Sequence, residues 1–244
     1  LLYVMGATGT LQCLDAATGE PIWSYDLVSE LEIGTPEWGF ASSPVIDEDQ
    51  VIVQCDVYDD AFIAALDLKD GATNWRVERE EISGWGTPLV VKTNRGTQIV
   101  ANGPRAICGY DASTEQELWR IGENSEVTVA SPIPNGDQVL VTGGYKPIDP
   151  IYSINPNSRG DLTDQILGNE GGKENSSGED DAVGWYLPKG GAYLITPLVY
   201  RDQIYIFQSN GVMSCRQADN GTEGYKKRVA SVRGGDLGAS PIAC

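Results

Sequence analysis

A proline that follows a small hydroxylated residue recurs along the chain at a nearly constant spacing, and this repeat constrains the fold more than any other feature. The instances are Ser43-Pro44, Thr87-Pro88, Ser131-Pro132, Thr196-Pro197 and Ser240-Pro241. Successive prolines lie 44, 44, 65 and 44 residues apart, so one repeat carries an insertion of about twenty residues. A fixed period of this length indicates repeated supersecondary units that pack against their neighbours.

A second column keeps step with the prolines: an aspartate followed eight residues later by a tryptophan. The pairs are Asp15 and Trp23, Asp67 and Trp75, and Asp111 and Trp119, with Gly19 and Gly71 in two of the turns and Trp185 at the tryptophan position of the longest repeat. We expect the aspartate to accept backbone N–H bonds within the turn and the glycine to supply a positive φ. The tryptophan is expected to pack against the neighbouring repeat.

Each repeat divides into four short segments rich in valine and isoleucine and separated by acidic or glycine-containing turns. In the second repeat these segments are 41–46, 51–55, 61–66 and 74–78. Four-stranded units of 40–50 residues are typical of β-propeller blades, and no segment has the period of a long amphipathic helix. We therefore predict an all-β chain: a β-propeller of four-stranded antiparallel blades, with about five blades present.

The whole chain, 1–244, is predicted to be a single propeller domain. The expected blades are 1–28 (partial), 41–80, 85–122, 130–187 and 194–229, with 239–244 starting another. The insertion 164–182 is acidic and rich in glycine and serine, so we expect a flexible loop. Two architectures are open. The favoured one is an internal fragment of a seven- or eight-bladed ring; the other is a five-bladed ring in which the last segment completes the first blade.

Composition excludes several classes of function. The chain has no histidine, which rules out Ser-His-Asp and Cys-His catalytic units and His-ligated metals. A net charge of −18, from 35 acidic and 17 basic residues, argues against nucleic acid as a partner. The five cysteines are neither adjacent nor spaced as CxxC, so no disulfide framework or thiolate metal site is predicted. No apolar run approaches the ~18 residues of a transmembrane helix.

Candidate binding residues come from loop parity. In a propeller, the links between blades and the loops between second and third strands emerge on one face, and we expect a ligand or partner there. The candidates are Trp38, Asp56, Asp59, Asp60, Trp85, Arg105, Tyr145, Lys146 and Tyr193. Trp38 and Trp85 lie outside the tryptophan column. They are either an aromatic platform or packing residues that close the channel, and packing is favoured.

The charged candidates also have two interpretations each. The run 56–60 supplies oxygen ligands of the kind calcium prefers, but it lacks a DxDxDG pattern, so a solvated turn is favoured. Arg105 and Lys146 either hold an anionic ligand or pair with nearby carboxylates. From the residues alone, no catalytic residue, metal site or cofactor is predicted.

The blade motif resembles that of the quinoprotein-type (PQQ-like) β-propeller repeat family, A-x-D-x-x-T-G-x-x-x-W. Cys13–Trp23 matches it best, Ala65–Trp75 matches in part, and Gly109–Trp119 lacks the glycine. The stretches Trp38–Pro44, Arg159–Thr163 and Gly190–Pro197 are similar to bacterial secreted members of the family. The resemblance covers essentially the whole chain and implies a periplasmic or extracellular location.

The resemblance implies two kinds of function. The favoured one is a non-catalytic extracytoplasmic scaffold that binds a protein or a small molecule. The alternative is a PQQ-dependent dehydrogenase with calcium, whose cofactor residues would lie largely outside this sequence, because the adjacent cysteines that such enzymes stack on the quinone are absent. A carbohydrate-binding propeller is a second alternative, supported only by Trp38, Trp85 and the turn at 56–60.

Overall fold

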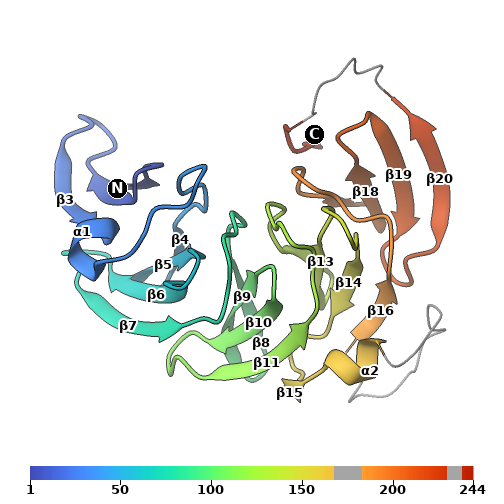
Figure 1. Cartoon of the computed structure of the whole chain (residues 1–244), viewed down its shortest axis with the longest axis horizontal. Helices are drawn as coiled ribbons and strands as arrows, with labels where there is room; N and C mark the ends of the chain where they lie inside the picture. Colours follow the sequence, from blue (N-terminus) through green and yellow to red (C-terminus); the bar gives the residue numbers. More distant parts are fainter. Residues whose placement is uncertain (168–182, 230–237, 244) are drawn as a thin grey trace.

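The computed structural model describes residues 1–167, 183–229 and 238–243. Strands within the described residues form five sheets that follow one another along the chain and lie side by side as the blades of an arc (Figure 1). The first and fifth sheets lie at the two ends of this arc. The prediction of an all-β propeller with four-stranded antiparallel blades is confirmed.

The strands have the following bounds. The first blade contains β1 (Leu2–Met5), β2 (Thr10–Leu14) and β3 (Pro21–Asp26), and the second contains β4 (Val45–Asp47), β5 (Gln50–Cys55), β6 (Phe62–Asp67) and β7 (Thr73–Glu78). The third blade contains β8 (Leu89–Thr93), β9 (Gly96–Asn102), β10 (Ala106–Asp111) and β11 (Glu117–Gly122). The fourth contains β12 (Ile133–Asn135), β13 (Gln138–Thr142), β14 (Ile151–Ile154) and β16 (Val183–Leu187). The fifth contains β17 (Leu198–Tyr200), β18 (Gln203–Phe207), β19 (Val212–Gln217) and β20 (Glu223–Arg228).

Three further elements lie in the segments that follow the blade strands. Helix α1 (Leu27–Leu31) follows the first blade, while β15 (Gly160–Asp161) and helix α2 (Thr163–Leu167) follow β14. The expected flexible loop at 164–182 is wrong for residues 164–167, which belong to α2, and the rest lies outside the described residues. The helix forms because Leu162 and Ile166 bury their side chains against the third blade. Among the described residues, no helix is long and apolar enough to cross a membrane.

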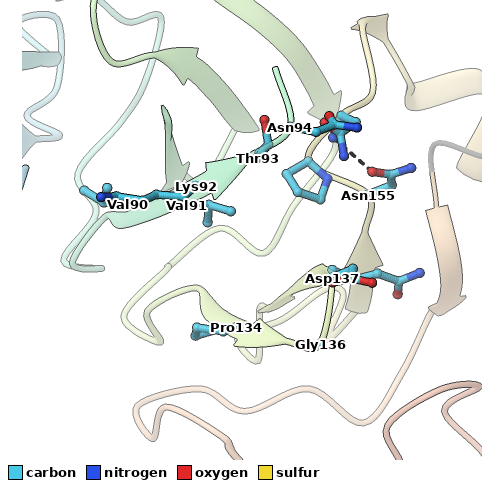
Figure 2. A pocket seen from close by; sticks show the side chains of 12 residues that line it. Val90, Val91, Lys92, Thr93, Asn94, Pro134, Gly136, Asp137 and Asn155 are labelled. Atoms are coloured by element: carbon cyan, nitrogen blue, oxygen red, sulfur yellow. Dashed lines mark hydrogen bonds between the residues drawn. The ribbon is translucent and has the colours of Figure 1, made fainter. Parts of the chain in front are cut away.

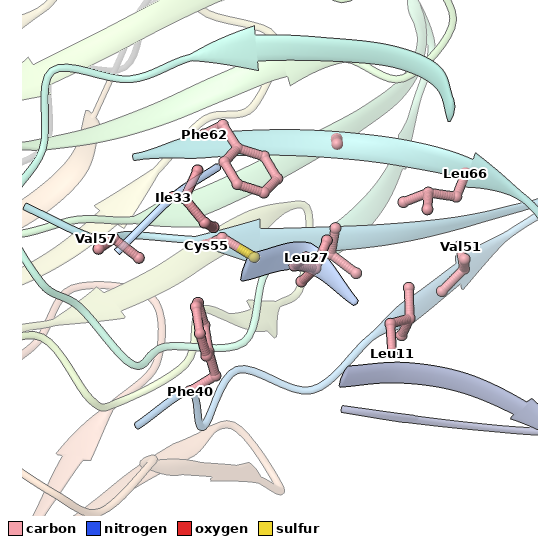
Figure 3. Close-up of a cluster of buried hydrophobic side chains, with 11 residues drawn as sticks. Leu11, Leu27, Ile33, Phe40, Val51, Cys55, Val57, Phe62 and Leu66 are labelled. Atoms are coloured by element: carbon pink, nitrogen blue, oxygen red, sulfur yellow. The ribbon is translucent and has the colours of Figure 1, made fainter. Parts of the chain in front are cut away.

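The hydrophobic core lies between blades. Leu11 and Leu27 of the first blade region pack against Val51, Phe62 and Leu66 of the second blade, as Figure 3 shows. Separate clusters fill the spaces between the following pairs of blades. Each blade is therefore stabilised mainly by its neighbours, as the repeat predicts.

The hydroxylated residues before the prolines connect the blades along the arc. The backbone N–H of Ser43, Thr87, Ser131 and Thr196 each donates to the side-chain hydroxyl of the next member of the column, at 3.0, 3.1, 3.1 and 3.1 Å. The predicted strand at 41–46 is wrong over 41–44: β4 begins at Val45, because Pro44 has no N–H and the N–H of Ser43 points to the next blade. The last link places Ser240 beside the fifth blade, and the described residues 238–243 form no strand with the first sheet.

The tryptophan column makes a second set of connections. The Nε1 atoms of Trp23, Trp75 and Trp185 donate to the carbonyls of Leu68, Ala112 and Ala218 in the following blade, at 3.0, 3.2 and 3.1 Å. Each acceptor directly follows the column aspartate, or Gln217 in the fifth blade. In the turns, Asp15 Oδ1 accepts the N–H groups of Ala17 and Thr18, and these bonds lower the pKa of Asp15.

Trp119 departs from this pattern. Its Nε1 donates to Gln98 Oε1 of its own blade at 3.2 Å, and its ring occupies the space that a Cβ on Gly109 would fill. Leu162 and Ile166 pack in the same cluster, and β15 adds to the outer edge of β11 in a parallel pairing. Trp119 is consequently 1% exposed, and the chain that leaves β14 reaches back over the third blade.

Candidate functional site

Two tryptophans meet at the face where the sequence places the ligand. The ring centroids of Trp38 and Trp85 are 5.1 Å apart, with an angle of 36° between the ring planes. Trp85 Nε1 donates to the carbonyl of Gly39 at 2.9 Å, whereas Trp38 is 66% exposed. Gly39 has φ +74°, and a Cβ there would lie 2.7 Å from the carbonyl oxygen of Ala7. Trp85 is thus an anchored support, and Trp38 presents its ring to solvent.

A second aromatic pair lies on the same side. Tyr145 and Tyr193 have ring centroids 5.1 Å apart, at an angle of 43°, and Tyr145 is 41% exposed. Ser125 Oγ accepts the N–H of Tyr145 and donates to its carbonyl, both at 2.7 Å. The N–H of Trp85 donates to the carbonyl of Thr128 at 2.8 Å. The link between the third and fourth blades therefore contacts both pairs.

Two buried asparagines hold these loops together. Asn102 Nδ2 donates to the carbonyls of Ala130 and Thr142, at 2.9 and 3.1 Å. Asn124 Nδ2 donates to Asn102 Oδ1 at 2.7 Å and to the carbonyl of Gly103 at 3.0 Å. Neither asparagine stands out in the sequence, because one carboxamide among many gives no signal until its partners are known. We call the face formed by these loops the mouth.

The structure separates the acidic candidates. Asp56 is 2% exposed: its Oδ1 accepts Arg79 Nε at 2.9 Å and its Oδ2 accepts Gln54 Nε2 at 2.6 Å. The favoured solvated turn is therefore wrong for Asp56, because Arg79 folds inward and neutralises it. Asp59 is exposed with φ +67°, and Asp60 Oδ2 accepts the N–H of Gly34 at 3.0 Å. Asp56 is therefore not available to bind a carbohydrate, and the carbohydrate hypothesis has one candidate carboxylate fewer.

Arg79 is the centre of a buried charge cluster that sequence analysis missed. Its Nη1 donates to Tyr110 Oη at 2.8 Å, and its Nη2 lies 3.5 Å from Glu81 Oε1. Burial raises the pKa of Glu81 to about 7, an effect larger than the lowering by Arg79. Burial also raises the pKa of Tyr110. In the sequence, Arg79 and Glu81 lie in a run of four charged residues, 78–81. Such a run is typical of a solvent-exposed segment, so the sequence gives no sign that these two side chains are buried.

The two basic candidates remain at the surface. Arg105 and Lys146 have exposed side chains, and the ion pairs found among the described residues include neither of them. The backbone N–H of Arg105 donates to Glu81 Oε2 at 2.7 Å. The position of Arg105 at the mouth is therefore tied to the buried cluster.

A separate depression lies between the third and fourth blades, at their β8–β9 and β12–β13 turns (Figure 2). It has a volume of about 590 Å³, and Val91 and Asn94 line it from one blade and Asp137 and Asn155 from the other. Asn155 Oδ1 accepts the N–H of Asn157 at 3.0 Å, as the turn aspartates do in other blades. The depression contains none of the predicted site residues.

The cysteines of the described residues are dispersed over the blades. Cys13, Cys55, Cys108 and Cys215 are separate buried thiols, and burial raises the pKa of Cys108 to about 11. The described residues contain no group of three or more Cys, Asp or Glu side chains placed to hold a metal ion.

The blades, their connecting tryptophans and the aspartate turns define a β-propeller of the PQQ-like repeat class. A family model described as outer membrane protein assembly factor BamB matches residues 1–95 and 59–155, which is more than half of the sequence. The chain belongs to this PQQ-like repeat family. No curated protein shows significant similarity to the sequence.

Solved structures share the fold at low identity. BamB from Moraxella catarrhalis has a TM-score of 0.62 and 16% identity, with 93% of this chain and 60% of that chain covered. Quinohemoprotein alcohol dehydrogenase ADHIIG from Pseudomonas putida HK5 has a TM-score of 0.59 and 16% identity, with coverage of 93% and 40%. The computationally designed Ika8 protein has a TM-score of 0.59 and 10% identity, with coverage of 99% and 62%. The chain spans less than two thirds of the length of each, and these identities establish the fold alone.

Proposed function

We propose that this propeller is a non-catalytic scaffold, located in the periplasm or outside the cell, that binds a protein segment at its mouth. The observation that carries the proposal is the exposed ring of Trp38, which rests on the anchored ring of Trp85. Tryptophan is enriched among the residues that dominate the binding energy of protein interfaces. BamB, an assembly factor by its name, shares the fold.

The loops of the mouth favour binding for a second reason. Asn102 is fully buried, and with Asn124 it joins the loops beneath the aromatic pairs. A surface that is already ordered loses little conformational entropy when a partner binds, so more of the contact energy appears as affinity. The mouth is built as a preformed surface.

A site-specific photocrosslinker at position 38 tests the proposal in cells that express the full protein. We expect a discrete crosslinked partner protein from position 38 and from position 145. Ile22 provides the control, since it is an exposed apolar residue (51%) on the outer strand of the first blade. Equal crosslinking from positions 22 and 38, or none from 38 and 145, would contradict the proposal.

The dehydrogenase is a second candidate because a quinohemoprotein alcohol dehydrogenase shares the fold. In that case the residues that bind PQQ and calcium would lie largely outside this sequence. Titration of the purified protein with PQQ and calcium, followed by absorbance and melting temperature, separates the two candidates. The scaffold proposal expects no change in either, and a calcium-dependent rise in melting temperature would favour the enzyme.

A further inference from the structure

The carboxylate of Glu81 holds the loop that carries Arg105. Glu81 Oε2 accepts the N–H of Arg105 at 2.7 Å, and Oε1 accepts the N–H of Ala106 at 2.9 Å. Two consecutive backbone donors bind one ionised carboxylate, and such charge-assisted bonds are about twice as strong as neutral ones. The side chain of Glu81 is 3% exposed, so water does not replace these bonds.

The loop fits closely over the cluster. Gly103 packs directly on Glu81 Oε1 and Arg79 Nη2, and a Cβ at this position would clash with both. Asn102 and the carbonyl of Gly103 are bound by Asn124 on the other side. The loop is therefore clamped between a carboxylate and a carboxamide, and Arg105 extends from it into solvent.

The charges around Glu81 do not balance. Arg79 is the cation of the buried cluster, and Asp56 already pairs with it at 2.9 Å, so Glu81 is a second carboxylate for one guanidinium. Tyr110 and Cys108 face Arg79 from β10 and carry no charge near neutral pH. An excess buried charge is costly, and proton uptake is the least costly way to remove it.

The neighbouring cleft adds further charges at a greater distance. It has a volume of about 380 Å³ and contacts Glu81, Arg79 and Arg105. Its other charged lining groups are Glu78, Glu80, Glu117, Arg120 and Asp161. Arg120 is paired with Glu117 at 2.6 Å and Glu78 with Arg76 at 2.9 Å, so the charges that act on Glu81 are those of Arg79 and Asp56.

We infer that Glu81 is a pH-sensitive clasp: in its ionised form it fixes the loop of Arg105 at the mouth, and proton uptake releases one of the two backbone bonds and frees the loop. Protonation leaves a single carbonyl oxygen to accept, because the hydroxyl becomes a donor. The raised pKa of Glu81, about 7, places the transition near neutral pH. The clasp can regulate binding at the mouth only if the proposed function holds. The titration of Glu81 itself is measured without any ligand.

The test uses the full chain. The ¹³C chemical shift of the Glu81 carboxyl gives its titration directly, and amide hydrogen exchange at Arg105 and Ala106, corrected for the intrinsic rate at each pH, reports the grip on the loop. We expect the carboxyl to titrate near pH 7 and the protection of one of these amides to fall about tenfold between pH 8 and pH 6. Glu81→Gln, which resembles the protonated form, should show low protection at both pH values.

Glu80→Gln is the matched control, because Glu80 is adjacent and exposed; it should retain the wild-type profile. The inference is overturned if Glu81 in the wild-type protein titrates below about pH 5, or if the protection of Arg105 and Ala106 is the same at pH 6 and pH 8. Both the carboxyl titration and the amide exchange are measured on the wild-type protein, so neither depends on whether a variant folds. Failure of the crosslinking from position 38 would remove the proposed function and leave the clasp intact.

Discussion

The indole of Trp23 lies against Gly71, the glycine of the aspartate turn in the next blade: a Cβ at Gly71 would be 2.9 Å from Trp23 Cε3. Gly71 also has φ +76°. Gly221 stands in the same relation to Trp185 in the fifth blade. The glycine of the motif thus has two roles, one within its turn and one as the surface on which the preceding blade's tryptophan packs.

Substitution of Gly71 by alanine separates these roles when it is compared with Gly19→Ala. Gly19 has nearly the same φ, +75°, and no atom within 4 Å of its Cβ position. We expect Gly19→Ala to cost about 1 kcal/mol of unfolding free energy from backbone strain, and Gly71→Ala about 1–3 kcal/mol more from overpacking. Denaturant titration measures both. Equal losses would mean that Trp23 moves aside without cost.

Trp119 should contribute more to stability than any mouth residue. It is 1% exposed and packs with Leu162 and Ile166, so Trp119→Ala is expected to lower the unfolding free energy by about 3–5 kcal/mol. Trp38→Ala, at 66% exposure, should cost less than about 1 kcal/mol. Thermal or denaturant unfolding distinguishes them. A large loss in Trp38→Ala would show that Trp38 serves packing, contrary to its proposed binding role.

The hydroxyl column is testable at Thr87, whose Oγ1 accepts the N–H of Ser43 at 3.0 Å. Thr87→Val keeps the shape and removes the acceptor, so the exposed N–H of Ser43 can bind only water, and we expect a loss of about 0.5–1.5 kcal/mol. Thr87→Ser retains the hydroxyl and should lose less. If the two variants have the same stability in denaturant, the bond does not hold the blades together.

Arg79 supports the second and third blades in a pH-dependent way. Arg79→Met leaves Asp56 and Glu81 buried without their cation, which should cost about 3–5 kcal/mol at pH 8. The folded-state pKa of Glu81, about 7, is raised above its ordinary value of 4.5. The stability that Glu81 contributes is therefore fully present below about pH 4.5 and is lost as the pH rises through 7.

Removing Arg79 raises this pKa further, so the loss in Arg79→Met should be larger at pH 8 than at pH 5. Arg120→Met is the control, because the Arg120–Glu117 pair is partly exposed, with side chains 42% and 32% accessible, and should cost about 0–1 kcal/mol at either pH. Unfolding free energies of both variants and the wild type, measured at pH 5 and pH 8, test this pH dependence. A loss that is independent of pH would contradict the placement of an ionised Glu81 next to Arg79.

The mouth could be predicted only in part. Loop parity selected Trp38 and Trp85 because both fall outside the tryptophan column, and the structure brings them into contact. The same rule selected Asp56 as an accessible acid, and this was wrong because Arg79, from the end of a different strand, encloses it. Composition and spacing carry no information about which charges in a run such as 78–81 turn inward.

The sequence by itself determined the blades. Proline and aspartate columns at a constant period specify where each strand starts and turns, because proline removes an N–H, aspartate binds the turn amides and glycine allows positive φ; these are local effects. Tertiary structure decided the rest. Trp119 turns into its own blade because Gly109 leaves room and Leu162 covers it, and Glu81 grips the Arg105 loop because a buried guanidinium attracts it. Both depend on contacts between distant segments, which packing and desolvation select only once the blades stand side by side.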